Sequence, residues 1–476
     1  MSRDADIGIH VPEDPWEGMI DPETGAPFEP PDDDVTAVTP QERRALDPDE
    51  FWDARPMFRH LHTFARARMV GPWAVLGAAM TRVMAAVSPN VQLPATIGSY
   101  ASLNLFVGLV GYSGDGKDAA QGVAAEALYI PEPPFKVSPL GSGEGLSHMF
   151  MRQVKATKEV PYPEPEQYQR AALVTIGEID SMAALVSRQA STLTSQLRQA
   201  AMGQQLGFFY ADQAKRMIVP EHAYRLCLIA GIQPEKSGVL LNDAAGGTPQ
   251  RFVWLPAGDP GGGREHRREG LSPMVWRSPD WMAARRAEDQ NQPRLLLTEP
   301  EACVDAILSA RETRMRANAA DGAANTLDSH AVLTRTKVAG CLAIMDGRVE
   351  ITDEDWDLSG VVMHVSDTQR ALCLRVLQRE REKENVGKAI AEAARSLVVE
   401  EHIDREKVGK CADAVKRQLR LAGGEWVAGA DLRRKIRANH REHLDAALDA
   451  LILSNEVEAE RGERSGQKVA RYKIRP

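Results

Sequence analysis

Cysteine, aromatic residues and long apolar segments are all scarce in this sequence of 476 residues. Its five cysteines are far apart and form no Cys-x-x-Cys pair, which argues against a disulfide scaffold or a zinc ribbon. The uncharged stretch 83–114 is interrupted by prolines and amides, whereas a membrane span needs about 20 mainly apolar residues. The first ten residues carry two aspartates where a signal peptide needs positive charge. We therefore expect a cytoplasmic protein with no membrane partner.

Acidic residues dominate only one part of the chain. Residues 1–40 hold eleven Asp or Glu and one Arg, so the net charge of -9 leaves +1 on all the other residues. The same segment has seven prolines and few apolar side chains, which is typical of disorder. The overall acidity therefore does not argue against a nucleic-acid partner.

The remaining chain is long enough for about three domains. Short apolar runs alternate with helical periodicity, which predicts an α/β fold with a mainly parallel sheet. One apolar run leads into a glycine-rich turn and then a helical stretch, which is the opening unit of a nucleotide-binding α/β domain, and the chain closes with three helical patterns and a hairpin. We therefore expect a P-loop NTPase core of the RecA/AAA-like kind, with a C-terminal winged helix-turn-helix. The predicted divisions are a disordered tail (1–45), a helical lead-in (46–100), the ATPase core (101–298), a helical lid (299–400) and the winged helix (401–476).

The strongest motif is a glycine-rich loop between an expected strand at 103–110 and an expected helix at 118–128. Its sequence supplies Gly-x4-Gly-Lys, in which backbone amides and the helix N-terminus would hold phosphates. Lys117 would reach the outer phosphates. The next residue is usually Ser or Thr and binds Mg²⁺, but here it is Asp118, which either ligates the metal or repels the phosphates. The expected ATP-binding residues are Gly111, Ser113, Gly114, Gly116, Lys117 and Asp118. The alternative is a glycine turn with a solvated lysine.

A second expected strand, 172–176, ends in Gly177-Glu178-Ile179-Asp180. Hydrolysis needs a carboxylate at the tip of a strand near the phosphates. We expect Glu178 to be the catalytic carboxylate, with Asp180 as metal-side or structural support, and we expect Asp118 and Asp180 to help bind magnesium. An Asp-Glu pair is usual at such a strand end, but Gly177 occupies the first position. The alternative is that Glu178 and Asp180 only cap the next helix.

Two later residues complete the predicted catalytic set. Gln233 follows a third expected strand at 226–232, where it would sense the terminal phosphate. Arg251 would reach the nucleotide of a neighbouring subunit as an arginine finger, which can be worth about 10³ to 10⁵ in rate. A strand-end glutamine with backbone hydrogen bonds only and an ordinary surface arginine are the alternatives.

Basic residues suggest contacts with DNA in two places. An expected hairpin over 206–219 carries Lys215 and Arg216 near its turn. Residues 401–476 hold 17 Lys or Arg against 13 acids, and clustering of this kind suits phosphate contacts. The candidates in that segment are Arg433, Arg434, Lys435, Arg437, Arg441, Arg464, Lys468 and Arg471. Solvated charge and a protein-binding winged helix stay open as alternatives.

Several phrases together resemble a little-characterised family of P-loop ATPases from phages, prophages and bacterial mobile elements. They are Ala101–Phe106, Gly141–Leu146, Gly177–Asp180, Gly231–Pro234 and Arg251-Phe252, and the resemblance spans about residues 50–375. It implies a helicase-like ATPase that works in DNA replication, and it suggests a primase as a partner. It also implies that Arg335 is a second sensor arginine, with a salt-bridging role as the alternative.

Two hypotheses follow from the sequence. The first is a ring-forming ATPase that couples hydrolysis of ATP with Mg²⁺ to movement on DNA. The second is a DNA-binding initiator, helicase loader or regulator that uses nucleotide as a switch and hydrolyses it poorly. Asp118 favours the second hypothesis, because a carboxylate beside the phosphates opposes the usual chemistry.

Overall fold

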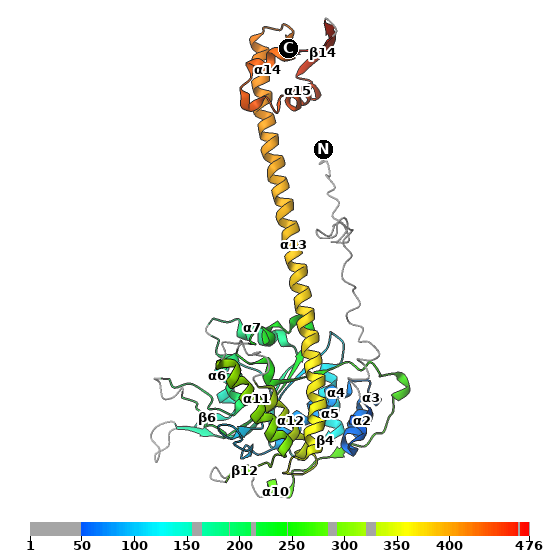
Figure 1. Ribbon diagram of the computed structural model, residues 1–476, viewed down its shortest axis with the longest axis vertical. Helices are drawn as coiled ribbons and strands as arrows, with labels where there is room; N and C mark the ends of the chain where they lie inside the picture. The colour runs from blue at the N-terminus through cyan, green and yellow to red at the C-terminus, as the bar shows by residue number, and fades with distance from the viewer. Residues whose placement is uncertain are drawn as a thin grey trace. The chain divides into compact units, whose positions relative to one another are not determined.

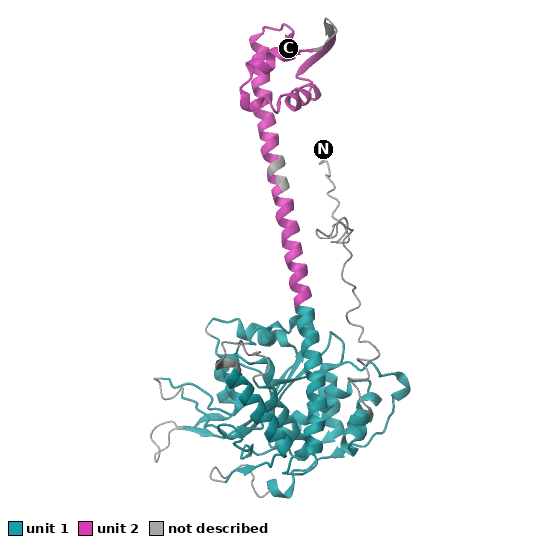
Figure 2. Ribbon diagram, viewed as in Figure 1, with its two compact units in different colours: residues 1–377 teal, residues 378–476 magenta. Residues whose placement is uncertain are grey.

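A computed structural model describes residues 49–154, 164–189, 191–210, 216–244, 246–283, 293–319, 330–464 and 467–475. The chain divides into two compact units, residues 1–377 and residues 378–476 (Figure 2). Each unit is described by itself below. Of the helices in the described part of the chain, none has both the length and the apolar character that a bilayer span requires.

A five-stranded, all-parallel sheet lies at the centre of the first unit (Figure 1). This confirms the predicted α/β class. The sheet interleaves strands that are distant in sequence, because the first strand of the set, β3, lies between the last two. In spatial order the strands are β10 (Phe252–Pro256), β3 (Phe106–Val110), β9 (Arg225–Ile232), β8 (Ala171–Ile176) and β5 (Lys136–Pro139).

The central strands are buried on both faces, as parallel strands usually are. All residues of β3 and β9 are buried. Side chains alternate between two clusters: Val107 and Leu109 belong to one, and Phe106 and Val110 belong to the other. This alternation follows from the period of two along a strand. Because both faces are buried, the apolar runs of these strands are continuous and do not alternate with polar residues.

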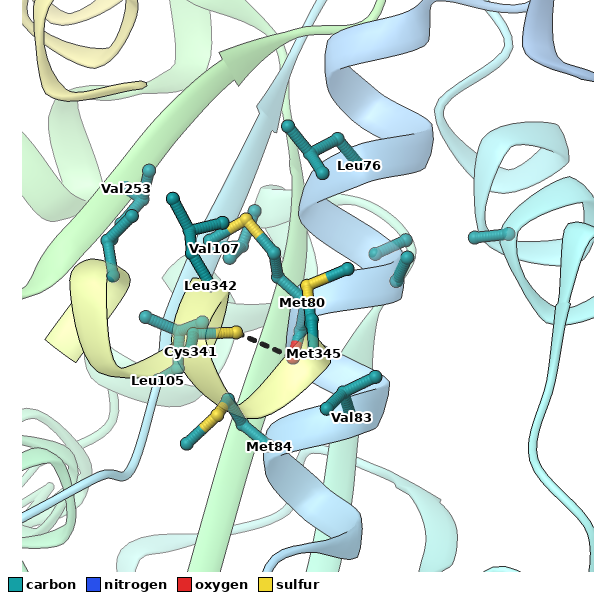
Figure 3. Close-up of a cluster of buried hydrophobic side chains, with 14 of the residues drawn as sticks. Leu76, Met80, Val83, Met84, Leu105, Val107, Val253, Cys341, Leu342 and Met345 are labelled. Atoms are coloured by element: carbon teal, nitrogen blue, oxygen red, sulfur yellow. Dashed lines mark hydrogen bonds between the residues drawn. The ribbon is translucent and has the colours of Figure 1, made fainter. Parts of the chain in front are cut away.

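Helices α3 (Pro56–Ala67), α4 (Pro72–Ala86) and α12 (Ala331–Met345) contribute to the first cluster. Figure 3 shows α4 and α12 side by side, with the Cys341 thiol donating to the carbonyl of Met80. Every residue of α4 except Arg82 is buried. A Cβ atom on Gly77 would lie 2.6 Å from Leu255 Cδ1, so a glycine lets α4 approach β10 and β3 closely.

The other face of the sheet is covered by α7 (Ile179–Val186), α8 (Leu193–Met202), α9 (Gly238–Leu241) and Cys373. This unit contains further helices and strands, several of which add side chains to the first cluster. They are α2 (Asp49–Asp53), β1 (Val91–Leu93), β2 (Ala101–Ser102), α5 (Lys117–Ala127), β4 (Leu128–Tyr129), α6 (Gly143–His148), β6 (Met151–Val154), β7 (Glu164–Gln167), β11 (Met274–Val275), α10 (Asp280–Ala283), β12 (Leu295–Leu296) and α11 (Glu301–Ala319).

The three expected strands and the helix after the glycine loop are confirmed as β3, β8, β9 and α5, with small shifts at their ends. The sequence analysis missed strand β10, although its run of four apolar residues before Pro256 is typical of a buried strand. The expected hairpin over 206–219 is described only in part, as one antiparallel bridge between Leu206 and Val219.

Helix α13 (Asp353–Leu421) begins in the first unit and ends in the second. Thr352 caps it: its hydroxyl accepts from the Asp355 amide, and the Asp355 carboxylate accepts from the Thr352 amide at 2.8 Å. The predicted boundary at residue 400 falls inside this helix. The predicted boundaries between the lead-in, the core and the lid stay predictions.

The second unit also contains two short helices and a small antiparallel sheet. Apolar side chains of α13, α14 and α15 form one core with Val457, Tyr472 and Ile474. The sheet has the order β13-β15-β14. The elements are β13 (Val427–Ala428), α14 (Gly429–Lys435), α15 (Leu444–Leu453), β14 (Val457–Arg464) and β15 (Gln467–Ile474).

Candidate functional site

The glycine loop lies at the carboxyl edge of the central sheet, between the ends of two neighbouring strands. It leaves β3 after Val110 and enters α5 at Lys117. The Gly111 amide donates to the Ile232 carbonyl on β9 at 2.9 Å, and the Ala257 amide after β10 donates to the Val110 carbonyl at 2.7 Å. Ligands of open α/β sheets bind outside this edge.

Glycine is required by the backbone at two loop positions. Gly114 has φ +93° and Gly116, the N-cap of α5, has φ +76°. Both values fall in the left-handed region that favours glycine. The Asp115 carboxylate accepts from the Tyr112 amide at 2.7 Å and so closes the turn from inside. Ser113 and Gly114 are exposed at its tip.

Lys117 is folded back over this loop. Its ammonium group donates to the carbonyls of Gly111 at 2.7 Å and Tyr112 at 2.6 Å, and the residue is buried. The alternative of a solvated lysine is therefore inconsistent with the structure. To reach a phosphate, the ammonium group would exchange one or both of these carbonyls for phosphate oxygens.

Asp118 lies next to the tip of β8 rather than alone on the helix. A Cβ atom placed on Gly177 would lie 3.8 Å from Oδ1 and 4.0 Å from Oδ2 of Asp118. The Asp118 side chain is exposed and has one long contact, 3.5 Å, with Gln121 Nε2. Asp118 departs from the usual pattern after the glycine loop and Gly177 from the usual pattern at the strand end, and the two residues lie close together.

Glu178 occupies the N-cap position of α7, but its side chain forms no capping hydrogen bond. Among the described residues, only its backbone carbonyl is hydrogen-bonded, and it accepts from the amide and the hydroxyl of Ser181. The carboxylate is exposed at the same edge of the sheet as Asp118. It is therefore available to a ligand, and the alternative of a purely capping side chain is not supported.

Asp180 has a different environment. Its carboxylate pairs with Lys236 Nζ at 2.5 Å, and this contact raises the pKa of Lys236. The pair links the start of α7 to the 3-10 turn Pro234–Lys236. A metal ion would have to compete with this ammonium group for the Asp180 carboxylate. In this structure Asp180 therefore joins the segments that follow β8 and β9.

Gln233 lies directly after β9, beside the anchored end of the glycine loop. The residue is 8% exposed, and its side chain forms no hydrogen bond with another described residue. Its backbone carbonyl accepts from the Lys236 amide at 3.0 Å. The side-chain amide is thus free for a ligand at the position where a phosphate sensor was predicted.

Arg251 lies at the opposite edge of the sheet from Lys117. It directly precedes β10, which runs parallel to β3, whereas the glycine loop follows β3. Its guanidinium donates to the carbonyls of Gly246 and Gly247 and contacts His330 Nε2 at 2.9 Å. Burial and the neighbouring Arg198 lower the pKa of Arg251 to about 10. The fold therefore keeps Arg251 away from the glycine loop of its own chain.

Arg335 is used in packing between two helices. It donates to the Trp356 carbonyl at 2.9 Å and to the Ser359 hydroxyl at 3.3 Å, and its guanidinium lies 3.7 Å from the centre of the Trp356 ring. These contacts join α12 to the first turns of α13. They are packing contacts rather than the ion pair of the salt-bridging alternative, and they favour a structural role over a sensor role.

The basic candidates are spread over several elements. Arg216 stacks on the ring of Phe209 at 4.1 Å, and Phe209 is 76% exposed. Lys215 lies outside the described residues, as do the side chains of Arg464 and Lys468. The candidates on and near α14 are exposed, and Arg434 pairs with Asp431 at 2.5 Å. Arg441 donates to the Ile436 carbonyl at 3.1 Å, and Arg471 is exposed on β15.

Magnesium suits the oxygen ligands at the carboxyl edge. The described residues contain no group of three or more metal-binding side chains, so protein groups alone would not enclose a cation there. Mg²⁺ is usually held by one or two carboxylates together with substrate phosphates. Asp118 and Glu178 fit this requirement. A bound Mg²⁺ would neutralise charge on the phosphates of ATP.

No protein-family model and no curated protein matches this chain. The functional argument therefore depends on the arrangement of residues described above. That arrangement contains four residues that the sequence analysis did not select: Asp115, Phe209, Lys236 and His330. Asp115 is recognisable from its place inside the glycine loop, but nothing in the sequence links Lys236 to Asp180 or His330 to Arg251.

Proposed function

We propose that this protein is a P-loop ATPase that binds ATP with Mg²⁺ and acts on DNA, in the replication of a phage or mobile element. One observation carries the proposal. The Gly111–Lys117 loop, a free strand-end glutamine and an exposed carboxylate all lie at the carboxyl edge of one parallel sheet. The interleaved strand order supports a RecA/AAA-like core, because β9 separates the loop strand from the strand that carries Glu178.

Each residue of the site has a proposed role. The loop amides and Lys117 bind the phosphates, since amides at a helix N-terminus and an ammonium group attract anions. Glu178 orients the attacking water, and Gln233 senses the γ-phosphate. Asp118, in the first turn of α5, holds Mg²⁺ together with the phosphates. Asp180 supports the site through Lys236.

We further propose that Arg251 acts between subunits, in a homo-oligomeric ring. Its position at the opposite edge of the sheet supports this role, because it lies away from the phosphate loop of its own chain. The contacts with Gly246, Gly247 and His330 then describe a resting position. A finger would leave these acceptors when a neighbouring nucleotide offers phosphate oxygens.

DNA is the proposed macromolecular partner. Three helical segments and a β-hairpin around one core support a winged helix in the second unit. Exposed arginines and a lysine on and after α14 would contact phosphates. Arg216, stacked on exposed Phe209, provides a second contact, since aromatic rings and guanidinium groups both stack on bases. Partnership with a primase rests on the family resemblance alone.

A nucleotide-dependent switch is the second candidate function. Asp118 beside Gly177 and the Lys236 contact of Asp180 favour it, because both change the carboxylates that hydrolysis uses. In this case the protein would be an initiator, a helicase loader or a regulator. It would bind ATP and DNA but turn ATP over slowly.

ATP binding and DNA-stimulated turnover test the two candidates together. For the ATPase, we expect DNA to stimulate turnover, Lys117→Ala to abolish it and Glu178→Gln to retain bound ATP without hydrolysis. Arg59→Ala is a matched control, because Arg59 pairs with Asp53 on the surface. ATP binding without DNA-stimulated turnover would favour the switch. A wild-type protein that binds no nucleotide would exclude both candidates.

A further inference from the structure

The structure shows no conformational reason for glycine at position 177. Gly177 does not have a positive φ, and a Cβ atom there would meet no described atom within 4 Å except the two carboxylate oxygens of Asp118, apart from its chain neighbours. Both distances, 3.8 and 4.0 Å, are ordinary van der Waals contacts. A larger residue would therefore fit the backbone, and Asp118 is what it would face.

A second carboxylate at this point would be costly. An aspartate at position 177 would begin at that Cβ position and bring its charge to within a few ångströms of Asp118. Two carboxylates at such a distance repel each other, and one of them is driven to its neutral form. With glycine at 177, no second carboxylate faces Asp118 from that position of the strand end.

Position 118 is also one where a carboxylate is stabilised. Asp118 lies in the first turn of α5, where the helix dipole favours a negative charge. The usual phosphate-loop arrangement has a hydroxyl here and a carboxylate at the end of the neighbouring strand. In this chain the carboxylate is on the helix, and position 177 at the strand end carries no side chain.

We propose that Asp118 and Gly177 are a compensating pair, in which Asp118 on the helix supplies the magnesium-binding carboxylate that is normally on the strand. This inference rests on the proposed nucleotide site and names the residue that holds its cation. It also assigns Gly177 a role, which is to keep the space in front of Asp118 free for a metal ion. Asp118 therefore supports nucleotide binding in the presence of Mg²⁺ and opposes it in the absence of metal.

The test is a cycle of variants: Asp118→Ser, Gly177→Asp and the double variant. ATP affinity is measured by calorimetry in EDTA and in Mg²⁺, and Mn²⁺ binding to the ATP complex is measured by electron paramagnetic resonance. In the wild type, we expect Mg²⁺ to strengthen ATP binding by about tenfold or more, which corresponds to about 1.4 kcal/mol. Each single variant should lose most of this gain. The double variant, with its carboxylate back on the strand, should recover it.

Two further variants separate metal binding from folding. Asp118→Asn keeps the shape of the side chain, so we expect ATP affinity in EDTA to be unchanged or higher while the gain from Mg²⁺ and the Mn²⁺ signal are lost. Glu126→Gln removes a carboxylate at the other end of the same helix, where it pairs with Arg68, and should change neither quantity. ATP affinity in EDTA also shows whether each variant is folded.

Several outcomes would overturn the pairing. They are a full Mg²⁺ gain in Asp118→Asn, a wild type whose ATP affinity does not respond to Mg²⁺, or a double variant in which the two losses add. In all three cases ATP still binds, so the proposed nucleotide site would survive. If the wild-type protein binds ATP in neither buffer, the proposed function fails, and the pairing fails with it.

Discussion

Arg251 and His330 form a contact that joins the start of β10 to the start of α12. Arg251 Nη2 lies 2.9 Å from His330 Nε2, and because a guanidinium cannot accept, the imidazole nitrogen must accept this hydrogen bond. The histidine is kept neutral, since burial and the neighbouring Arg251 lower its pKa to about 4. The proposed finger is thus held in place by a partner 79 residues away in the sequence.

This placement predicts complementation between inactive variants. Arg251→Ala should reduce ATP turnover by about 10³ or more if it is a finger. Lys117→Ala should be inactive as well. A mixture of the two proteins should recover part of the turnover, because some interfaces then combine an intact loop with an intact finger. Turnover is measured over a series of mixing ratios.

The control for this experiment is the double variant, Lys117→Ala with Arg251→Ala, mixed with either single variant. The double variant offers neither an intact loop nor an intact finger, so its mixtures with either single variant should recover no ATP turnover. If the two single variants also fail to complement each other while both remain folded and oligomeric, Arg251 has no role between subunits.

The burial of Lys337 predicts that the stability of the protein depends on pH. Lys337 is buried with its ammonium group donating to the carbonyls of Asn104 and Ala201, and burial lowers its pKa to about 7. The unfolded chain keeps this lysine protonated up to about pH 10.4. Between these values the unfolded state binds more protons, so stability rises with pH by up to about 1.4 kcal/mol per pH unit.

Lys337→Met isolates that contribution. Replacing a buried charge by an apolar side chain is often neutral or stabilising, although here two carbonyls lose their donor. We expect the free energy of unfolding of the variant, relative to that of the wild type, to be highest at pH 7 and below and to fall progressively towards pH 10. Urea unfolding at several pH values measures the difference. A difference that does not change with pH would show that Lys337 has an ordinary pKa.

Gly231 predicts a steric requirement beneath the site. A Cβ atom on this residue of β9 would lie 2.1 Å from the Gly177 carbonyl oxygen. Gly231→Ala should therefore cost about 1–3 kcal/mol, as overpacking in a core typically does, and should displace the tip of β8. Gly122→Ala on α5 is the matched control. It meets no atom within 4 Å and should stabilise the helix by about 0.5–1 kcal/mol.

Urea unfolding distinguishes these two glycines, and ATP affinity shows whether the site is affected. A Gly231→Ala variant as stable as wild type would mean that β8 and β9 can separate at no cost, which would contradict the close approach. Equal effects of the two substitutions would show a general loss of chain flexibility instead.

Lys435 and Arg437 predict the DNA contacts of the second unit. Both are exposed, and neither has an ion-pair partner among the described residues. Alanine at both positions should weaken DNA binding and reduce the slope of log affinity against log salt by about 0.9 for each phosphate that is no longer neutralised. Fluorescence anisotropy over a range of salt concentrations measures both. Lys416→Ala is the control, because Lys416 already pairs with Glu456 at 3.1 Å.

An unchanged salt slope in the double variant would indicate that this surface binds protein rather than DNA. A slope reduced equally in the Lys416→Ala variant would show only an effect of net charge. The winged-helix assignment would then lose its support from electrostatics and would depend on the arrangement of helices and hairpin alone.

Short-range preferences account for the local elements of this protein. The glycine loop, the strand before it, the helix after it and the cap of α13 at Thr352 could all be predicted, because left-handed backbone, apolar runs and helix N-termini each require particular residue types. Strand β10 could have been identified by the same reasoning, since its apolar run is bounded by Pro249 and Gly258.

Which of these residues meet depends on the packing of the whole first unit. The parallel sheet brings Gly177, Glu178 and Gln233 to the edge that carries the glycine loop, and it takes Arg251 to the other edge. Asp118 and Gly177 each break a familiar pattern, and their relationship appears only when α5 lies against the tip of β8. Contacts between residues distant in sequence depend on strand order and helix packing, which no local propensity contains.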